Sequence, residues 1–432
     1  MKNFLLLFFL TTTVYAQVPS ISWVQQDSLK EYMYGGIEAS DGSYITVGLT
    51  NFGEHVIKKT QCNGTVSWTV QYGTLRNWGV RETVDHNYIV VGDTASDARL
   101  TKVDTAGNIL WERGYIYSSP NEHGYGIDLT PDGGYILLSN YVQLGCRIIK
   151  TDSIGILQWD TLYTNFENAM AIVTSANYTY TFLSSQGLPF DSVYLTQIDA
   201  AGGIVWKRAF GGHSGPSWSA NSLIRTTDGG FAFVATDASK GCLYKTDMMG
   251  NLQWKKFLFP GYAYSMSQTP DSGYLVSGVN YGTYLMKTNA VGDSLWSYRR
   301  SPVFSSSQVG FPTSDSGYFY AACCDTALNT DFSIKFNYGG TPCTIPTTIP
   351  EITKYTPPVI FPNPVFTKAN INTGSKGSYT FSVTDISGNE VLKFSFTGQH
   401  AEFNKGNLSP GLYLYQLQNE KGVAGRGKIL VE

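Results

Sequence analysis

The chain contains few charged residues. Of its 432 residues, 15% are Asp, Glu, Lys or Arg, and the formal net charge is -3. Electrostatic binding of nucleic acid or an anionic membrane needs clustered positive charge, so neither partner is expected. Met is also scarce, at 7 residues, whereas Gly numbers 45 and Tyr 29, a balance that favours short strands and tight turns over helices.

Histidine is scarce as well, and no catalytic motif compensates for it. The five histidines form no His-Glu-x-x-His motif and no i, i+4 pair, so a zinc hydrolase would lack its ligands. There is no Gly-x-Ser-x-Gly elbow of a serine hydrolase. His123 and His213 stand beside Glu122 and Ser214, where a general base is conceivable, but solvated loop side chains are the simpler interpretation. We therefore predict no catalytic residue, no metal site and no cofactor.

Long apolar runs are missing except near the N-terminus. Lys2 precedes the run Phe4–Leu10, and Val14 and Ala16 supply the small residues that signal peptidase requires. We expect a signal peptide over residues 1–16 with cleavage between Ala16 and Gln17. An apolar core this short does not cross ~30 Å of hydrocarbon, and nothing later supplies ~20 apolar residues, so no transmembrane segment is predicted.

Tryptophan recurs along the chain at intervals of 42 to 48 residues. This period is typical of a repeat that holds four short strands. We take these tryptophans as the residues that define the repeats: Trp23, Trp68, Trp111, Trp159, Trp206, Trp254 and Trp296.

Two turn signatures accompany the tryptophans. The first is Asp-Gly or a relative, as in Asp41-Gly42 and Asp132-Gly133, and it precedes runs such as Tyr135–Leu138 that are apolar on both faces. Such runs indicate strands covered on both sides. The second signature is Lys-x-Asp followed by Gly, as in Lys150–Gly155. The fourth unit, near Asn177, has lost the first signature.

The ends of the repeat region indicate a closed ring. Trp23 has no turn signature before it, and the last unit has Asp315 and Lys335 but no tryptophan after them. The first strand therefore completes the last unit, an arrangement that removes exposed sheet edges in a ring. We predict an all-β fold in which residues 17–340 form a seven-bladed β-propeller with about 46 residues per blade.

The strand order within a blade sorts the loops onto two faces. Both regular turns belong to one face, and the loops of varied length and sequence belong to the other, where repeat rings usually bind. Aromatic residues predicted on the variable face are candidates for stacking on sugars or anchoring a protein, with blade-to-blade packing as the alternative: Trp78, Tyr115, Tyr117, Trp218 and Tyr262.

The six cysteines are not spaced as a metal site, and an exported protein can form disulfides. Cys146 and Cys242 occupy the same place in two separate repeats, which predicts separate buried thiols. Cys323 and Cys324 remain ambiguous. Cys62 and Cys343 belong to turns on either side of the ring closure, and we predict a disulfide between them.

A proline-rich and threonine-rich segment, residues 341–358, reads as an extended linker. Beyond it, Tyr379, Phe381 and Val383 alternate with polar residues, as do Leu412 and Leu414 with their neighbours, and Gly-rich turns intervene. This pattern predicts a small Ig-like antiparallel β-sandwich over residues 359–432.

The tail resembles a known family. Phe361–Pro364, Val383–Val391, Leu408–Tyr413 and Gly427–Val431 look in order and spacing like the type A C-terminal sorting domain of the Bacteroidetes type IX secretion system. The matching residues are Pro362, Asn363, Pro364, Asp385, Gly388, Gly411, Tyr413 and Lys428. The resemblance implies Sec export, recognition by the type IX machinery and a secreted or surface-attached product. The prolines would begin an edge strand, and Lys428 would keep the last strand polar on its exposed side.

Two functions follow as hypotheses. The first is a non-enzymatic propeller that binds a glycan or a protein through its variable loops. The alternative is a secreted enzyme, acting on polysaccharide or as a quinone-dependent oxidoreductase, because Asp104-x-x-Gly107-x-x-x-Trp111 is similar to the tryptophan docking repeat of quinone enzymes. Partly buried carboxylates with perturbed pKa values at the channel mouth would favour catalysis, and an aromatic or neutral mouth would favour binding.

Overall fold

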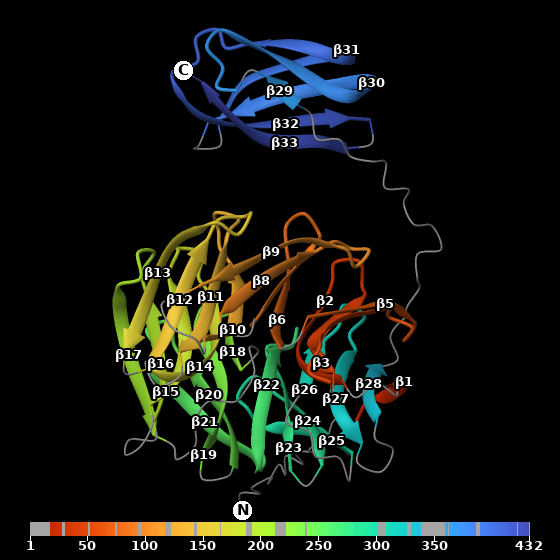
Figure 1. Cartoon of the computed structure of the whole chain (residues 1–432), viewed down its shortest axis with the longest axis vertical. Helices are drawn as coiled ribbons and strands as arrows, with labels where there is room; N and C mark the ends of the chain where they lie inside the picture. Colours follow the sequence, from red (N-terminus) through yellow and green to blue (C-terminus); the bar gives the residue numbers. More distant parts are fainter. Residues whose placement is uncertain are drawn as a thin grey trace, which may run out of the picture. The chain divides into compact units, whose positions relative to one another are not determined.

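The computed structural model contains only β-strands among the residues that it describes, and it divides into two compact units, residues 1–345 and 346–432. The structure describes residues 18–27, 31–50, 52–73, 76–93, 97–116, 122–141, 145–164, 166–186, 192–211, 222–237, 240–280, 282–300, 308–325, 330–337, 359–361, 363–385, 389–420 and 422–431. The first unit holds seven four-stranded antiparallel sheets, as predicted, and these are the blades of a β-propeller (Figure 1).

Each blade runs from an innermost to an outermost strand. The innermost strands are β2 (Glu31–Glu38), β6 (Asn77–Glu82), β10 (Glu122–Leu129), β14 (Glu167–Thr174), β18 (Leu223–Arg225), β22 (Tyr262–Gln268) and β26 (Gln308–Pro312). The second strands are β3 (Tyr44–Thr50), β7 (Tyr88–Asp93), β11 (Tyr135–Tyr141), β15 (Tyr180–Gln186), β19 (Phe231–Asp237), β23 (Tyr274–Val279) and β27 (Tyr318–Asp325). The third strands are β4 (His55–Thr60), β8 (Ala98–Val103), β12 (Gly145–Thr151), β16 (Ser192–Ile198), β20 (Lys240–Thr246), β24 (Thr283–Thr288) and β28 (Thr330–Asn337). The outermost strands are β5 (Val66–Tyr72), β9 (Ile109–Tyr115), β13 (Leu157–Thr164), β17 (Ile204–Gly211), β21 (Leu252–Pro260), β25 (Ser294–Arg300) and β1 (Ser20–Asp27).

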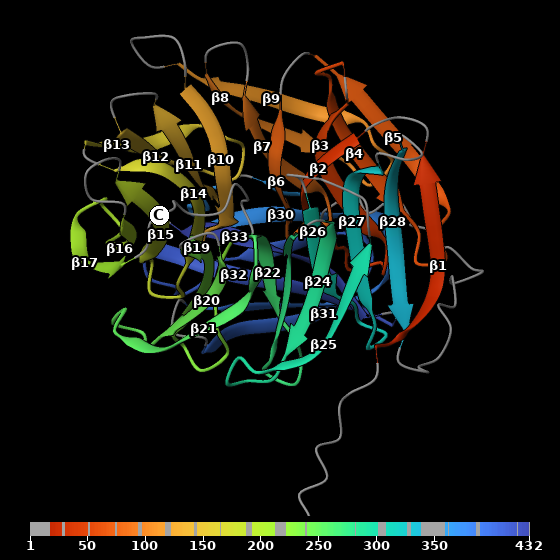
Figure 2. The ribbon, with the colours of Figure 1, turned by 90° about the horizontal axis from the view of Figure 1, so that it is seen from below.

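The N-terminal strand closes the ring. β1 pairs antiparallel with β28, so Trp23 lies opposite Lys335 and Val24 opposite Ile334. Figure 2 shows β1, from the start of the chain, beside β28, from the end of the repeat region. The last sheet therefore has the order β1-β28-β27-β26, and the predicted closure is confirmed.

Burial follows strand position. The second strand β7 and the third strand β8 of one blade are buried at every residue. The outermost strand β5 instead alternates between exposed and half-buried residues. The apolar runs on both faces are therefore covered by neighbouring blades, as the sequence pattern predicted.

The first turn of every blade, between its innermost and second strands, has one backbone geometry. The residue directly after the turn's aspartate, or after Asn177 in the fourth blade, takes a positive φ in all seven blades. These residues are Gly42, His86, Gly133, Tyr178, Gly229, Ser272 and Ser316. The expectation that the fourth blade had lost this turn is wrong. Ser175 and Thr179 still form the turn hydrogen bond, and Tyr178 adopts φ 60° although it is not glycine. The face that carries the first turns and the third-to-fourth-strand turns is here called the turn face, and the opposite one the loop face.

A buried lysine joins the two turns within six of the blades. Its Nζ lies 2.7–2.8 Å from the first-turn aspartate, and its side chain is 1–9% exposed. The pairs are Lys59–Asp41, Lys102–Asp85, Lys150–Asp132, Lys245–Asp228, Lys287–Asp271 and Lys335–Asp315. In the fourth blade both partners are replaced, because Gln197 and Asn177 stand at these positions, and Gln197 bonds Thr181 instead.

The tryptophans join neighbouring blades. Each indole lies 5.3–6.4 Å, between ring centroids, from the aromatic residue that opens the second strand of the next blade. Six of the seven indoles also cover the glycine of the next blade's outer turn: a Cβ on Gly250 would lie 2.6 Å from Trp206, and one on Gly64 2.9 Å from Trp23. Trp23 makes this contact across the closure and donates from Nε1 to the Cys62 carbonyl at 2.8 Å. The docking repeat is therefore architectural.

Cys146 and Cys242 are buried free thiols, as predicted. Cys62 and Cys323 each take part in a disulfide. Cys343 and the side chain of Cys324 lie outside the described residues, so the Cys62–Cys343 pairing stays a prediction.

The second unit is a small antiparallel β-domain built on one long strand. β30 (Lys368–Thr384) pairs with β29 (Val359–Phe361) and β32 (Gly411–Asn419) along one edge and with β31 (Glu390–Asn404) along the other, and β33 (Gly422–Val431) adds to β32. Tyr379, Phe381 and Val383 are buried as predicted. Leu412 and Leu414, however, are exposed, because Tyr413, Tyr415 and Leu417 occupy the core face of β32.

Asp271→Asn should lower the free energy of unfolding by about 2 kcal/mol, because it leaves the buried Lys287 ammonium without its counter-charge. Lys287→Met should cost less than about 1 kcal/mol, since the half-exposed Asp271 stays solvated. Urea unfolding of the full chain measures both. Asp293→Asn, in the exposed pair with Lys256, is the matched control and should leave the urea midpoint unchanged. Equal costs for Asp271→Asn and Lys287→Met would contradict this account.

The same pairs predict acid sensitivity. Burial raises the pKa of each first-turn aspartate, but hydrogen bonds from lysine and neighbouring groups lower it more, so the pKa falls from 3.8 to about 2 for Asp85 and Asp228. A pKa that is lower in the folded state contributes stability above the unfolded value and loses it as pH falls. Urea midpoints should therefore drop from about pH 4 toward pH 2, and less steeply in the Asp85→Asn/Asp228→Asn variant. Parallel curves for the two proteins would exclude this role.

Candidate functional site

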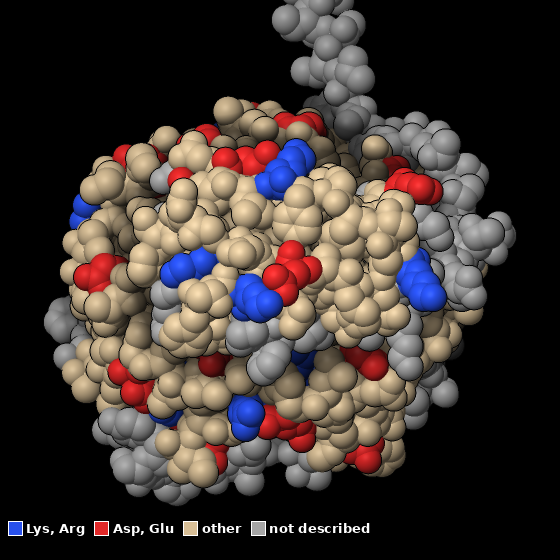
Figure 3. Space-filling model, turned by 90° about the horizontal axis from the view of Figure 1, so that it is seen from above, with Lys and Arg blue, Asp and Glu red and all other residues tan. Residues whose placement is uncertain are grey.

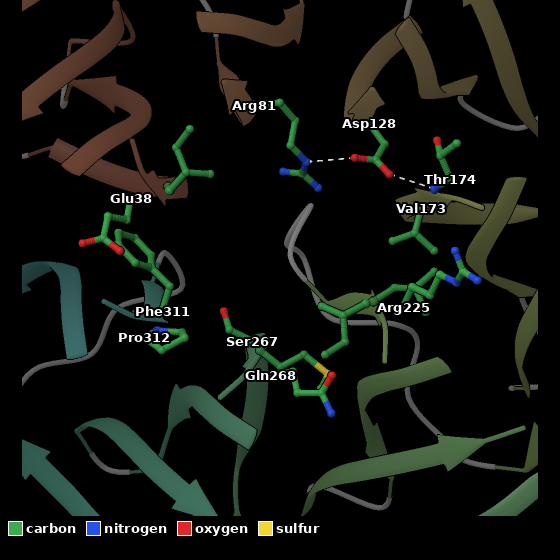
Figure 4. Close-up of a pocket in the computed structure, with 15 residues that line it drawn as sticks. Glu38, Arg81, Asp128, Val173, Thr174, Arg225, Ser267, Gln268, Phe311 and Pro312 are labelled. Atoms are coloured by element: carbon green, nitrogen blue, oxygen red, sulfur yellow. Dashed lines mark hydrogen bonds and ion pairs between the residues drawn. The ribbon is translucent and has the colours of Figure 1, made fainter. Parts of the chain in front are cut away.

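The innermost strands of all seven blades surround a common cavity of about 540 Å³ at the turn face (Figure 4). We call it the turn-face pocket. It is lined by Gly36, Ile37, Glu38, Arg81, Asp128, Val173, Thr174, Leu223, Ile224, Arg225, Met266, Ser267, Gln268, Phe311 and Pro312. These residues stand at the ends of the inner strands, just before the first turns, so the pocket is a consequence of closing seven blades into a ring.

The polar groups of the turn-face pocket mostly connect blades. Arg81 Nε donates to Asp128 Oδ1 at 3.1 Å, and the Thr174 backbone N–H donates to Asp128 Oδ2 at 2.7 Å (Figure 4). Glu38 accepts hydrogen bonds from the backbone N–H and the hydroxyl of Ser314 in the last blade. Burial raises the pKa of Glu38, and the bonds from Ser314 only partly offset this. Both carboxylates of the turn-face pocket therefore accept hydrogen bonds that join neighbouring blades.

The rest of the turn-face pocket is largely apolar. Val173 and the Ser267 hydroxyl point into the cavity in Figure 4, and Phe311 covers the side near Glu38. Arg225 is exposed at the rim. On the face of the molecule seen in Figure 3, Lys and Arg side chains lie among Asp and Glu side chains, several of them in adjacent pairs of opposite sign. No large field of one sign marks that face.

Three aromatic side chains of neighbouring innermost strands pack against one another. Tyr34, Trp78 and Tyr125 occupy the same bulged position of β2, β6 and β10, and their ring centroids are 4.3 Å apart for Tyr34–Trp78 and 4.6 Å for Trp78–Tyr125. We call them the aromatic girdle. Burial raises the pKa of both Tyr34 and Tyr125 to about 12, so the phenols stay neutral hydrogen-bond donors.

A polar cluster adjoins the aromatic girdle where the loops of the loop face enter β6 and β10. Asp93, with a side chain 2% exposed, accepts from the Arg76 backbone N–H at 2.7 Å and bonds His123 Nδ1 at 2.8 Å. The Arg76 guanidinium lies over Trp78, with Cζ 5.6 Å from the ring centroid. We call Arg76, Asp93 and His123 the loop-end cluster.

The aromatic residues predicted to bind a ligand differ in their position and burial. Trp78 stands in β6 and is 3% exposed, so it belongs to the aromatic girdle and not to a loop surface. Tyr115 is buried and donates its hydroxyl to the Gly155 carbonyl at 2.8 Å, which is the packing alternative. Tyr262 is 49% exposed at the start of β22. Tyr117 and Trp218 lie outside the described residues.

Of the two candidate histidines, the structure describes only His123. His123 stands in β10 and is oriented by Asp93, so it is not a solvated loop side chain. Its neighbour Glu122 is fully buried in an ion pair with Arg147, at 2.9 Å, and burial raises the pKa of Glu122. His213 and Ser214 lie outside the described residues.

Sequence reasoning missed Tyr34, Arg76, Asp93 and Tyr125. A signal for the aromatic girdle was present, because an aromatic residue stands ten positions before the strand-opening tyrosine in four repeats: Tyr34, Trp78, Tyr125 and Tyr264. No comparable spacing marks Arg76 or Asp93, which come together only through the pairing of β6 with β7.

Within the described part of the chain, no three His, Cys, Asp or Glu side chains are placed to hold a metal ion. A helix of the length and apolarity needed to span a membrane is likewise not found among those residues.

The tail motifs meet in space. Asn363 Nδ2 donates to the Lys428 carbonyl at 3.1 Å, and its Oδ1 accepts from the Leu430 N–H at 2.9 Å. The Val365 N–H donates to the Leu430 carbonyl at 2.7 Å. The first and last motifs of the tail therefore pair with each other. Pro364 does not begin a strand as predicted, because β29 ends at Phe361 and Asn363 and Pro364 lie in a bend before β30.

The remaining tail residues have local roles. Asp385 accepts the Asn389 N–H at 2.9 Å in the turn before β31, and the Tyr413 hydroxyl bonds the Ser409 carbonyl at 2.9 Å. Gly411 pairs with Val431, and Lys428 is exposed on β33. Pro362 and Gly388 lie outside the described residues.

Comparison with known proteins agrees with both units. Residues 359–432 match the family described as a secretion system C-terminal sorting domain. No curated protein matches the chain significantly. The WD40 β-propeller domain of Doa1 superposes with a TM-score of 0.55 at 12% identity, over 76% of this chain and 98% of that domain. This likeness shows the propeller fold.

Two Bacteroidetes structures are similar over more of the chain. PorZ of Porphyromonas gingivalis, an essential surface component of the type IX secretion system, gives a TM-score of 0.49 at 10% identity over 91% of this chain. The extracellular domain of the one component system BT4673 from B. thetaiotaomicron gives 0.48 at 11% identity over 96% of this chain. The chain spans only 58% of the length of each.

Asn363→Ala should reduce display of the protein at the cell surface, because the last strand loses both side-chain bonds that tie it to the first motif. Surface immunolabelling and periplasmic fractionation measure the effect. Deletion of residues 359–432 should trap the propeller in the periplasm and gives the full-loss reference. Asn370→Ala, an exposed asparagine of β30, is the matched control and should export normally. Unchanged display after the deletion would refute the sorting role.

Proposed function

We propose that this chain, an exported β-propeller protein with a type IX secretion sorting domain at residues 359–432, is a binding protein that takes a glycan or a surface protein at its loop face. The sorting domain directs passage across the outer membrane and display or release outside the cell. The propeller is then the part that is delivered.

The hydrogen bonds of polar side chains at the two faces support the loop face as the binding face. At the turn face, Asp128, Glu38 and Gln268 accept hydrogen bonds from backbone groups of neighbouring blades. Arg225 is exposed at the rim, but no aromatic ring is found over its guanidinium among the described residues. At the loop face, Arg76 extends an exposed guanidinium for which no side-chain hydrogen bond is found within the described chain. Polar groups left over after folding are the ones available for recognition.

Binding also fits the channel better than catalysis does. The enzyme alternative calls for at least two carboxylates with separated pKa values around a cavity. In the turn-face pocket both oxygens of Glu38 accept from Ser314. Those of Asp128 accept from Arg81 and from the Thr174 N–H, so both carboxylates are engaged in contacts between blades. The aromatic girdle and the neutral phenols match the binding hypothesis.

A glycan array and a pulldown of surface proteins, both with the full chain, test this proposal. We expect specific capture of a glycan or a protein. Ser267→Trp, which fills the turn-face pocket, should leave that capture unchanged, whereas Tyr262→Ala, at the exposed start of β22 on the loop face, should weaken it severalfold if the ligand spans the channel mouth. Loss of capture in folded Ser267→Trp, with full capture by Tyr262→Ala, would assign binding to the wrong face and reject the proposal.

A further inference from the structure

The loop-end cluster offers a cation in a fixed place. The Arg76 backbone N–H is held by Asp93 Oδ1 at 2.7 Å, which sets where the side chain begins, and the guanidinium then lies over Trp78. Stacking on an aromatic ring limits the motion of an arginine without using its N–H donors. Arg76 is therefore a cation of fixed orientation, and no hydrogen bond from its guanidinium N–H groups is found among the described residues.

His123 is oriented in the same way. Its Nδ1 bonds the buried carboxylate of Asp93 at 2.8 Å, and its ring packs edge-on against Tyr125 at 6.3 Å between centroids. A carboxylate that accepts from Nδ1–H fixes the tautomer and leaves Nε2 for a ligand. The His123 side chain is 33% exposed, so Nε2 is within reach of solvent.

The accessible charge of the loop-end cluster is positive, which favours an acidic ligand. Its carboxylate, Asp93, is 2% exposed and already accepts two hydrogen bonds, so it is not offered to a ligand. The adjoining phenols, Tyr34 and Tyr125, have pKa values raised to about 12 and stay neutral. What remains accessible is the Arg76 cation beside neutral donors and aromatic carbon.

Resting on the proposed function, we propose that the loop-end cluster binds a uronic acid residue of an acidic glycan. Arg76 pairs with the sugar carboxylate, for which its planar fork is the matching geometry. His123 Nε2 accepts a hydrogen bond from a ring hydroxyl, and the half-buried Tyr34 packs against the C–H face of the ring. A sulfated sugar is the competing source of negative charge, but a tetrahedral sulfate does not need the planar fork.

Titration calorimetry with the full chain tests this assignment. The probes are oligogalacturonate and a glucuronic acid oligosaccharide, each compared with its methyl ester and with a sulfated neutral oligosaccharide. We expect at least one acid to bind about 10- to 100-fold more tightly than its ester, because a charged hydrogen bond is lost on esterification. Arg76→Gln should abolish this preference, and His123→Asn should weaken acid and ester by similar factors.

Arg113→Gln is the matched control, because Arg113 is an exposed arginine of the outermost strand β9, away from the inner strands. It should bind like the unmodified chain, and the urea midpoints of all variants should agree. Equal affinity for acid and ester, preference for the sulfated probe, or equal loss in Arg113→Gln and Arg76→Gln would overturn the assignment. Capture of a neutral glycan or a surface protein alone would also overturn it while leaving the proposed function standing.

Discussion

The propeller depends on one repeated contact, the packing of a tryptophan of each outermost strand onto the next blade. Every indole packs on an aromatic ring of the next blade's second strand, and six of the seven also cover a glycine of its outer turn, so these contacts fix both the spacing and the angle between blades. All seven contacts are local in sequence, that of Trp23 with Tyr44 included. The row of blades becomes a ring because β1, which carries Trp23, pairs with β28 at the end of the repeat region.

The ring geometry explains where polar chemistry is available. Within a blade, the buried lysine–aspartate pair holds the two turns, and between blades Glu38 and Asp128 cap neighbouring backbone groups. The carboxylates of the turn-face pocket therefore take part in interactions that hold the scaffold. At the loop face, Asp93 sets the orientations of Arg76 and His123. Among the described residues, the Arg76 guanidinium and His123 Nε2 have no hydrogen-bond partner, so both are available to a ligand. A rigid scaffold that presents unsatisfied groups at one end is the expected arrangement for a binding protein.

Much of this architecture could be predicted from sequence, because the tryptophan period and the unmatched ends are properties of the chain order alone. The failures have local causes. Tyr178 replaces a glycine at a positive φ, which its sequence context does not reveal. Trp78 was assigned to a loop because the start of β6 depends on pairing with β7. In β32, Leu412-Tyr413-Leu414-Tyr415 is apolar on both faces, so alternation cannot tell which face is buried. The loop-end cluster is a product of tertiary pairing and has no signature in the sequence.

The closure of the ring is tested most directly by a cysteine pair across the register of β1 and β28. Gln25 and Ser333 are direct partners, so Gln25→Cys/Ser333→Cys should form a disulfide quantitatively under mild oxidation of the native full chain, as peptide mapping would detect. The offset pair Gln25→Cys/Asn337→Cys should stay reduced, because Asn337 is the partner of Ser20. No cross-link in the first variant, or equal cross-linking in both, would mean that the N-terminal strand does not complete the last blade.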